Sequence, residues 1–315
     1  MRTEAKNNAE MREINEVSMK SGFVSIIGRP NVGKSTLLNA ILGEKIAITS
    51  GKPQTTRNRI RGVYTESGKD SGIQLVFIDT PGIARPRNRL GAYMTDQALS
   101  TFGEVDIVLL VASEALGEKG GDNFIVERLR EVPTPKLLAI NKMDMMDPLA
   151  YRNIFESYEK TGLFENIIGI SALKGQNVDI LIDTIKPYMS EGPQYFPDDI
   201  VTDLPERFLA CEIIREKMLN FLHDEVPHGI AVEIESYEEK PNLTKISAVI
   251  MTEKSSHKGI IIGKDGHTLK GIGKSARTEI EALFGVRVFL QLWVKVCENW
   301  RDDRRALSSL GYIRE

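Results

Sequence analysis

The stretch GRPNVGKS, residues 28–35, decides the fold of this chain. It fits the pattern G-x-x-x-x-G-K-[ST], and such a match arises by chance roughly once per hundred chains of this size at average glycine usage. An apolar run, FVSIIG (23–28), precedes it, and a helical pattern begins at Lys34, which is the setting in which this loop cradles phosphates. The Lys34 ammonium would meet the β and γ phosphates, the Ser35 hydroxyl would ligate Mg²⁺, and backbone N–H groups would face the phosphates. The stretch therefore predicts a nucleoside triphosphate site.

A second motif, NKMD (141–144), predicts which base is bound. It follows an apolar run, at the carboxyl edge of a strand where open α/β sheets bind their ligands. Guanine presents its N1–H and its exocyclic amine side by side, so the Asp144 carboxylate can accept from both, whereas adenine lacks that pair. Asn141 can brace the loop and reach the base edge, and the stem of Lys142 can lie along the base. The motif favours guanine.

A third motif, DTPG (79–82), ends the apolar run 73–79. Asp79 can hold Mg²⁺ through water, and the Gly82 N–H can touch the γ-phosphate. The motif therefore completes the phosphate end of the predicted site.

Two further stretches fit the same site. SAL (171–173) ends another apolar run, where the Ala172 N–H can meet the guanine oxygen. KPQTTRNRIR (52–61) lies between the phosphate loop and DTPG and carries Thr55 and Thr56. A threonine in this place usually closes over Mg²⁺ when the γ-phosphate is present; alternatively, both threonines belong to a solvated turn.

Apolar strands and amphipathic helices alternate from about residue 22 to residue 190. Three near-continuous apolar runs are typical of strands buried on both faces, and two others are joined by a glycine-rich turn like a hairpin. The runs are 105–112, 136–141 and 166–171, and the hairpin strands are 60–65 and 73–79. The pattern predicts a doubly wound α/β sheet with one antiparallel strand, as in P-loop NTPases.

The alternation stops at SEGPQYFPDDIVTDLP (190–205), a proline-containing stretch with little apolar periodicity. We therefore expect four parts. They are an N-terminal tail (1–21), a nucleotide-binding domain (22–190), a linker (191–204) and a second domain (205–315).

The second domain has a different pattern. A helix is expected over 206–226, alternating strands over 230–239 and 243–253, a helix ending at about 283, and a strand over 286–296. This is α-β-β-α-β order, which predicts a small α+β domain.

The motif Gly263-Lys264-Asp265-Gly266 lies between the second and third of these strands. G-x-x-G alone is a weak signal, but residues 254–277 carry six lysines and arginines against Asp265. The loop itself does not end in a lysine–serine pair that could serve Mg²⁺, so it is not a second loop of the first kind. The basic loop predicts contact with a nucleic-acid backbone; the alternative is a solvated basic helix after a tight turn.

Taken together, the motifs of the first domain resemble the small regulatory GTPases of the P-loop class. The second domain resembles a type II KH domain, whose G-x-x-G clamps about four single-stranded nucleotides. Over residues 22–315 the chain resembles the Era family of bacterial ribosome-assembly GTPases. The stretches VTDLPERFLACEIIREK (201–217) and LWVKVCENWRDDRRALSSLGY (292–312) carry that resemblance along with the motifs.

The resemblance implies a role for each matching residue. Catalytic roles fall to Lys34, Thr56 and Gly82, and Mg²⁺ ligation to Ser35, Thr56 and Asp79. RNA contacts fall to Ile261, Ile262, Gly263, Lys264, Asp265, Gly266, Lys270 and Lys274, with the two isoleucines forming an apolar floor for unstacked bases. Nucleotide contacts fall to Gly28, Arg29, Pro30, Asn31, Val32, Gly33, Lys34, Ser35, Thr36, Asp79, Thr80, Pro81, Gly82, Ile83, Asn141, Lys142, Met143, Asp144, Ser171 and Ala172.

Ile83 departs from the pattern of Ras-type enzymes, which place a water-orienting glutamine after the last glycine of this motif. An isoleucine cannot orient water, so slow intrinsic turnover is expected. Asn31 occupies the place where potassium-dependent relatives ligate the cation, so K⁺ is a candidate cofactor beside GTP, GDP and Mg²⁺.

The family implies binding near the 3′ end of 16S ribosomal RNA, assembly of the 30S subunit, and peripheral contact with the inner membrane in some members. No apolar run reaches the ~18 residues of a membrane helix, and two cysteines make no disulfide framework, which favours the cytosol. We expect a monomer. Two alternatives stay open: an RNA-binding module in which GTP is structural, and a membrane-associated signalling GTPase whose C-terminal domain binds a protein.

Overall fold

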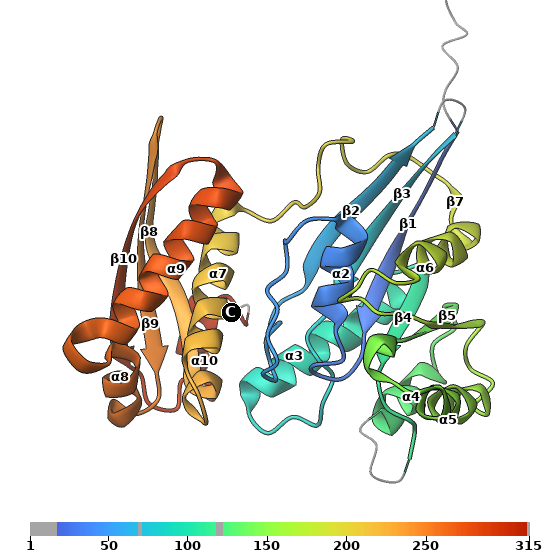
Figure 1. Ribbon diagram of the computed structural model, residues 1–315, viewed down its shortest axis with the longest axis horizontal. Helices are drawn as coiled ribbons and strands as arrows, with labels where there is room; N and C mark the ends of the chain where they lie inside the picture. The colour runs from blue at the N-terminus through green and yellow to red at the C-terminus, as the bar shows by residue number, and fades with distance from the viewer. Residues whose placement is uncertain (1–17, 69–70, 118–121, 314–315) are drawn as a thin grey trace, which may run out of the picture.

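The computed structural model describes residues 18–68, 71–117 and 122–313. Two layered units lie side by side, a larger one built around a seven-stranded sheet and a smaller one around a three-stranded sheet (Figure 1). The expected tail over residues 1–17 lies outside the described residues. No helix of the described ranges is long and apolar enough to cross a bilayer.

The larger sheet has the order β2-β3-β1-β4-β5-β6, and β7 pairs with β1. Its strands are parallel except β2, which runs antiparallel to β3, and the two-residue β7, which runs antiparallel to β1. The sequence predicted one antiparallel strand; β7 is the second. The strands are β1 (Ser18–Ile27), β2 (Ile60–Ser67), β3 (Ser71–Asp79), β4 (Ile107–Ala112), β5 (Lys136–Ile140), β6 (Asn166–Gly169) and β7 (Ser190–Glu191).

Helices cover both faces of this sheet. All residues of β4 and β5 are buried, which accounts for their unbroken apolar sequence. One apolar cluster lies beneath α2 and α6, and a second beneath α3, α4 and α5. The helices are α2 (Lys34–Leu42), α3 (Arg89–Leu99), α4 (Asn123–Leu129), α5 (Pro148–Glu159) and α6 (Val178–Ile185). The loops after β1, β3, β5 and β6 therefore meet at one edge of the sheet.

Both ends of this unit differ from the sequence expectation. β1 begins at Ser18 rather than near residue 22, because residues 18–22 continue the parallel pairing with β3. The linker is held against the sheet edge: the Val63 N–H donates to Val201 O at 2.8 Å, and the Gln74 side chain bonds the backbone of Phe196. This linker follows the β2–β3 edge before it reaches the second unit.

The smaller unit is built on a sheet with the order β10-β9-β8, and helices lie on both of its faces. β8 and β9 are antiparallel, and β9 and β10 are parallel. Its elements are α7 (Glu206–Phe221), β8 (Ile230–Lys240), β9 (Leu243–Thr252), α8 (Ser255–Ile262), α9 (His267–Phe284), β10 (Arg287–Val296) and α10 (Arg304–Ser309). The helix α8 was not expected. The order is therefore α-β-β-α-α-β, and the G-x-x-G loop joins two helices.

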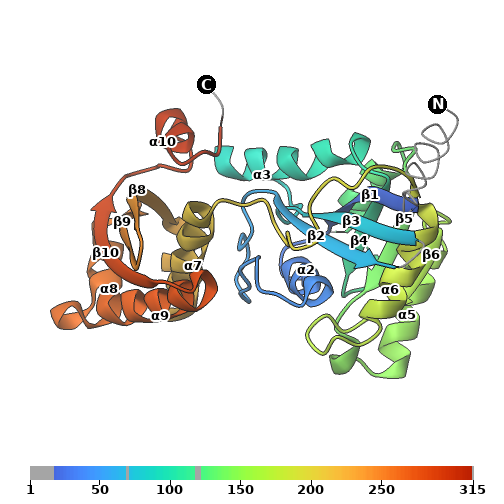
Figure 2. The same cartoon turned by 90° about the horizontal axis from the view of Figure 1, so that it is seen from above.

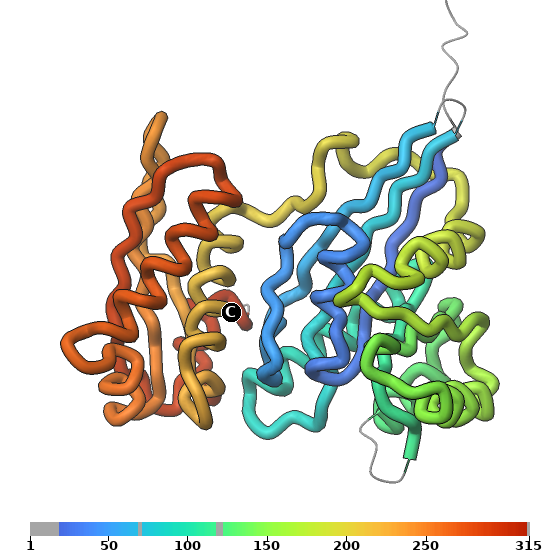
Figure 3. Tube along the Cα trace, in the orientation of Figure 1, coloured from blue at the N-terminus to red at the C-terminus, as the bar shows by residue number. Residues whose placement is uncertain are grey.

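The two units are in direct contact. The segment between α2 and β2 runs alongside α7 (Figure 3). On the other side of the smaller sheet, α10 lies beside the N-terminal end of α3 (Figure 2). Leu90 and Met94 of α3 pack in one buried cluster with Trp300, Leu307 and neighbouring sheet residues. The nucleotide-binding edge of the larger sheet thus borders the second unit.

Candidate functional site: the phosphate, base and RNA loops

The phosphate loop turns sharply between β1 and α2. Gly33 has φ +102°, and a Cβ there would lie 2.2 Å from Asn141 Nδ2, so only glycine fits. Lys34 begins α2, is buried, and donates through Nζ to Arg29 O at 3.0 Å. Burial lowers the pKa of Lys34 to about 8, against the attraction of Asp79. A phosphate brought to this loop would favour the charged ammonium.

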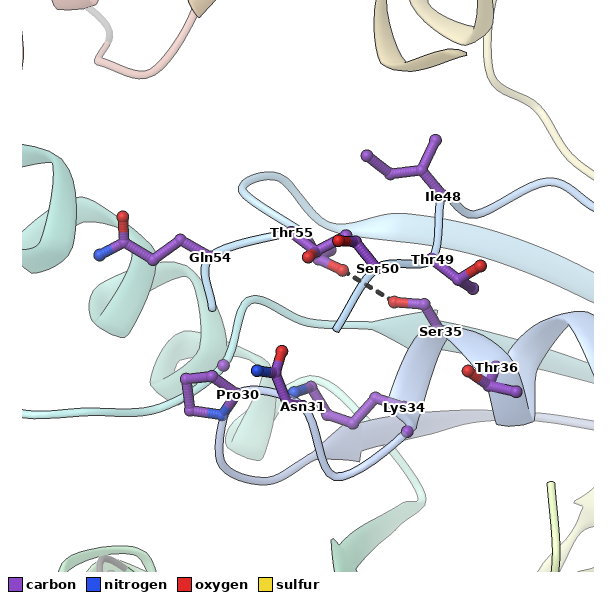
Figure 4. A pocket seen from close by; sticks show the side chains of 13 residues that line it. Pro30, Asn31, Lys34, Ser35, Thr36, Ile48, Thr49, Ser50, Gln54 and Thr55 are labelled. Carbon is purple, nitrogen blue, oxygen red and sulfur yellow. Dashed lines mark hydrogen bonds between the residues drawn. The ribbon is translucent and has the colours of Figure 1, made fainter. Parts of the chain in front are cut away.

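Three oxygen-bearing side chains meet beside Lys34. Ser35 Oγ lies 2.6 Å from Asp79 Oδ2 and 2.8 Å from Thr56 Oγ1, and Thr56 Oγ1 lies 3.4 Å from the same Asp79 oxygen. Figure 4 shows Ser35 directed from α2 toward the segment that carries these threonines. The other Asp79 oxygen, Oδ1, is buried without a partner. Hard oxygen donors of this kind suit Mg²⁺, so the three residues predicted to hold the metal fit it.

Burial changes the acidity of Asp79. It raises the pKa of this carboxyl to about 6, although Lys34 and the hydrogen bond from Ser35 act in the opposite direction. A cation at this place would favour the ionised form.

The base-recognition motifs lie next to each other across β5 and β6. The Asn141 side chain donates from Nδ2 to Val32 O at 2.8 Å and accepts at Oδ1 from the Ala172 N–H at 2.9 Å. Asn141 therefore ties the phosphate loop to the end of β6, and it already uses the N–H expected to meet the guanine oxygen. Asp144 is exposed, and its Oδ1 accepts from Ser171 Oγ at 2.6 Å. This bond leaves Oδ2 and the second lone pair of Oδ1 for the two guanine donors.

Several other expected nucleotide contacts have structural partners. Thr80 Oγ1 donates to Ile26 O at 2.8 Å, and Arg29 makes a salt bridge to Glu114 at 2.8 Å. Ile83 is 1% exposed and packs in the apolar core, so its side chain faces away from the phosphates. Backbone atoms remain the means by which these positions can contact a nucleotide.

A cavity beside the phosphate loop is lined by more of the residues expected to contact the nucleotide. Pro30 and Thr36 line it with other residues of the phosphate loop (Figure 4). Gly82 lines it as well. Ile48, Thr49, Ser50 and Gln54 also line it and were not predicted. Gln54 lies within the stretch QTTR (54–57), and nearness to that stretch is the only sequence signal that could have suggested the other three. Two further expected positions, Lys142 and Met143, follow β5, and the Met143 N–H donates to Ile170 O at 3.1 Å.

The segment that carries Thr56 also enters the second unit. Arg57 is buried, donates from Nη1 to Ile230 O at 2.8 Å, and lies 5.5 Å above the centroid of the Trp300 ring. Arg215 of α7 donates to Thr55 O. Neighbouring residues of one loop thus contact the metal-site side chains and the KH-like sheet.

The second glycine loop lies at the solvent boundary. Gly263 and Gly266 have φ +72° and +75°, and a Cβ on Gly263 would lie 2.2 Å from Thr268 Oγ1. Glycine at 263 is therefore needed by the loop itself. The exposed positions expected to contact RNA are Lys264, Asp265, Lys270 and Lys274.

The expected apolar floor needs a correction. Ile261 is 0% exposed and packs in the core of the second unit, because it lies on the inward face of α8. Its side chain cannot meet bases. Ile262 is half-buried, and the exposed isoleucine of this helix is Ile260, at 52%.

Comparison with known proteins matches each of the two units to a protein family. Residues 23–142 match the family model of the 50S ribosome-binding GTPase, and residues 225–301 match that of the KH domain. A GTPase Era of Alkaliphilus metalliredigens is 55% identical over 94% of this chain and 100% of its own. A GTPase Era of Clostridioides difficile is 53% identical over 93% and 98%.

Two solved structures are similar over the same length. The crystal structure of an Era variant of Aquifex aeolicus bound to GDP·AlF4⁻ has a TM-score of 0.88 and 40% identity, covering 94% of this chain and 100% of that one. An Era complex with MgGDPNP and nucleotides 1506–1542 of 16S ribosomal RNA has a TM-score of 0.88, 41% identity and the same coverage. Because relatives with 53–55% identity cover nearly the whole chain, and the GTPase and KH family models both match it, the chain belongs to the Era family of GTPases.

Proposed function

We propose that this protein hydrolyses GTP with Mg²⁺ and binds the 3′ end of 16S ribosomal RNA during assembly of the 30S subunit. The solved relatives bound to GDP·AlF4⁻, and to MgGDPNP with 16S RNA, support both halves. The observation that carries the proposal is the shared loop: Thr56 lies against Ser35 and Asp79, while the next residue, Arg57, is buried between Ile230 and Trp300. A change at the γ-phosphate can therefore reach the RNA-binding unit.

Each part of the nucleotide has a matching group. The loop N–H groups and the Lys34 ammonium take the β and γ phosphates. Ser35, Thr56 and Asp79 would hold Mg²⁺, which supplies charge compensation to the phosphates when bound. The Asp144 carboxylate accepts from the guanine N1–H and amine.

Position 83 carries an isoleucine where other GTPases have a glutamine that orients the attacking water, and the Ile83 side chain is packed in the core. Turnover is expected to be slow until another group or a partner supplies that function. Asn31 could ligate K⁺, because its Nδ2 donates to Gly51 O at 2.7 Å and its Oδ1 remains for a metal ion. We therefore keep K⁺ as a candidate cofactor.

In the second unit, the Gly263–Gly266 loop takes the RNA backbone, with Lys264, Lys270 and Lys274 meeting phosphates. Residues 22–190 and 205–315 are the two working units, joined by residues 191–204. The proposed compartment is the cytosol, where GTP and ribosomal RNA are both present, and the free thiols of Cys211 and Cys297 fit a reducing environment. Peripheral membrane contact stays a prediction.

The test is the rate of GTP hydrolysis with and without a single-stranded 3′-terminal fragment of 16S RNA. The wild type should hydrolyse GTP slowly alone and faster with RNA, and Lys264→Asp should lose the acceleration but keep the basal rate. No hydrolysis under either condition would mean that GTP is structural. Hydrolysis that never responds to RNA, with no RNA binding, would favour a protein partner for the second domain.

A further inference from the structure

The outer face of β10 carries two exposed aromatic side chains. This strand alternates regularly: Val288 and its same-face neighbours pack toward the helices, whereas positions 287, 289, 291, 293 and 295 face solvent. Phe289 is 50% exposed and Trp293 is 59% exposed. The other tryptophan, Trp300, is fully buried. Large exposed rings on an edge strand are a liability in a soluble protein unless a ligand covers them.

The charge around these rings is positive. Arg287 and Lys295 flank them on β10, and Lys245 of β9 lies directly opposite Phe289. None of these three cations makes a salt bridge to the described part of the chain. The nearest carboxylate across the sheet is Glu238 on β8, which lies opposite Lys245. The β10 side of this face therefore suits an anionic ligand.

The spacing of the rings suits an extended strand of bases. Residues two apart on a strand lie about 6.6 Å apart, so Phe289 and Trp293 are separated by about 13 Å with Gln291 between them. Single-stranded nucleic acids bind to such surfaces by stacking bases on aromatic side chains while cations contact the phosphates.

The face is also close to the glycine loop. β9 and β10 are parallel and end together, at Thr252 and Val296, and α8 begins just after β9. α8 packs against β10, and the Gly263–Gly266 loop follows α8 directly. Figure 2 shows β10 as the outermost strand, with α8 and α9 on one side of the sheet and α10 on the other. A strand leaving the loop can pass around this free edge onto the outer face.

We propose that the outer face of β10 is a second RNA contact, in which Phe289 and Trp293 stack bases of the strand held at Gly263–Gly266, and Arg287, Lys295 and Lys245 meet its phosphates. This inference rests on the proposed RNA binding. It predicts a longer RNA footprint than the four nucleotides of the glycine loop.

The experiment measures binding of two RNAs to the full chain with a non-hydrolysable GTP analogue. The short RNA fills only the glycine loop, with about four nucleotides. The long RNA is the 3′-terminal 16S fragment, extended by about six nucleotides at each end. Trp293→Ala should weaken the long RNA by about tenfold and leave the short RNA unchanged. Trp293→Phe should retain most of the affinity, and Trp293→Leu, apolar but without a π face, should not.

Intrinsic fluorescence gives an independent readout, because Trp293 is the exposed one of two tryptophans. The long RNA should quench it and the short RNA should not. Equal affinities of wild type and Trp293→Ala for the long RNA would overturn the proposal, while loss of binding in Lys264→Asp would leave the RNA function standing. If Lys264→Asp and wild type both fail to bind either RNA, the proposed function itself fails. If Trp293→Ala impairs binding only to intact small subunits and not to RNA, the face binds a ribosomal protein and the stacking proposal is wrong.

Discussion

Replacing Asp79 with asparagine should change how the metal-free protein responds to pH. The Asp79 carboxyl is buried, and one of its oxygens has no partner, so burial raises its pKa from 3.8 to about 6. In the unfolded chain the carboxyl ionises at its ordinary pKa. In the folded chain the ionised form is disfavoured by about two pKa units, or ~3 kcal/mol.

The sign follows from proton binding. Between these two pKa values the folded chain holds a proton at Asp79 that the unfolded chain has released. The contribution of Asp79 to stability is therefore fully present below the unfolded pKa and is lost as the pH rises through the folded pKa. Asparagine is neutral throughout and can still accept from Ser35. From about pH 4 to about pH 6.5, Asp79→Asn should gain about 2 kcal/mol in the free energy of unfolding relative to wild type.

Urea unfolding in EDTA, with nucleotide removed, measures this difference directly. Asp144→Asn is the matched control, because Asp144 is an exposed carboxylate of the same site and its replacement removes no buried charge. Adding Mg²⁺ and a GTP analogue should reverse the ranking, because wild-type Asp79 then has a cation and the variant has lost a ligand. If the free energies of unfolding of wild type and Asp79→Asn differ by the same amount at every pH, the inference that burial disfavours the ionised Asp79 carboxylate is refuted.

Three further predictions concern the nucleotide. Asp144→Asn should weaken GTP and strengthen binding of xanthosine triphosphate, because xanthine offers an acceptor where guanine has a donor; equal GTP affinities in wild type and variant would contradict the base assignment. Lys34→Ala should lower the single-turnover rate of GTP hydrolysis by about 10²-fold or more, through loss of charge beside the phosphates, and a wild-type rate would rule out the phosphate role. Hydrolysis by the wild type should be faster in potassium than in sodium, and Asn31→Ala should remove that difference; identical rates of the wild type in both salts would eliminate the K⁺ site.

The nucleotide site could be predicted because its motifs are local. GRPNVGKS, DTPG and NKMD each follow a buried strand, and the carboxyl ends of parallel strands meet at one edge of the sheet. The order β3-β1-β4-β5-β6 then brings Asp79, Ser35 and Asn141 together. No knowledge of distant packing was needed for that step.

The sequence predictions failed where tertiary packing determines the secondary structure or the burial of a residue. The run GIII (259–262) is too short for its periodicity to separate a helix from a strand, so α8 was missed, and with it the burial of Ile261. The alternation of β10 predicted a strand correctly, but not which part of its outer face is covered. Residues 297–312 cover Val249 and Met251 of the neighbouring strand and leave Trp293 exposed.

The position of Arg57 was beyond prediction for a further reason. In the sequence it is one of several cations in a polar stretch, and such residues are usually solvated. Its burial depends on Ile230 and Trp300, which are more than 170 residues away in the chain. Withdrawing Arg57 would break its hydrogen bond to Ile230 O and its contact with the Trp300 ring, and these contacts hold the loop against the second unit. Thr56 cannot move far while Arg57 stays. The two residues therefore link the metal site to the position of the second unit. If Mg²⁺ and GTP at Thr56 change the affinity of the second unit for RNA by some factor, RNA must change the affinity for Mg²⁺ and GTP by the same factor.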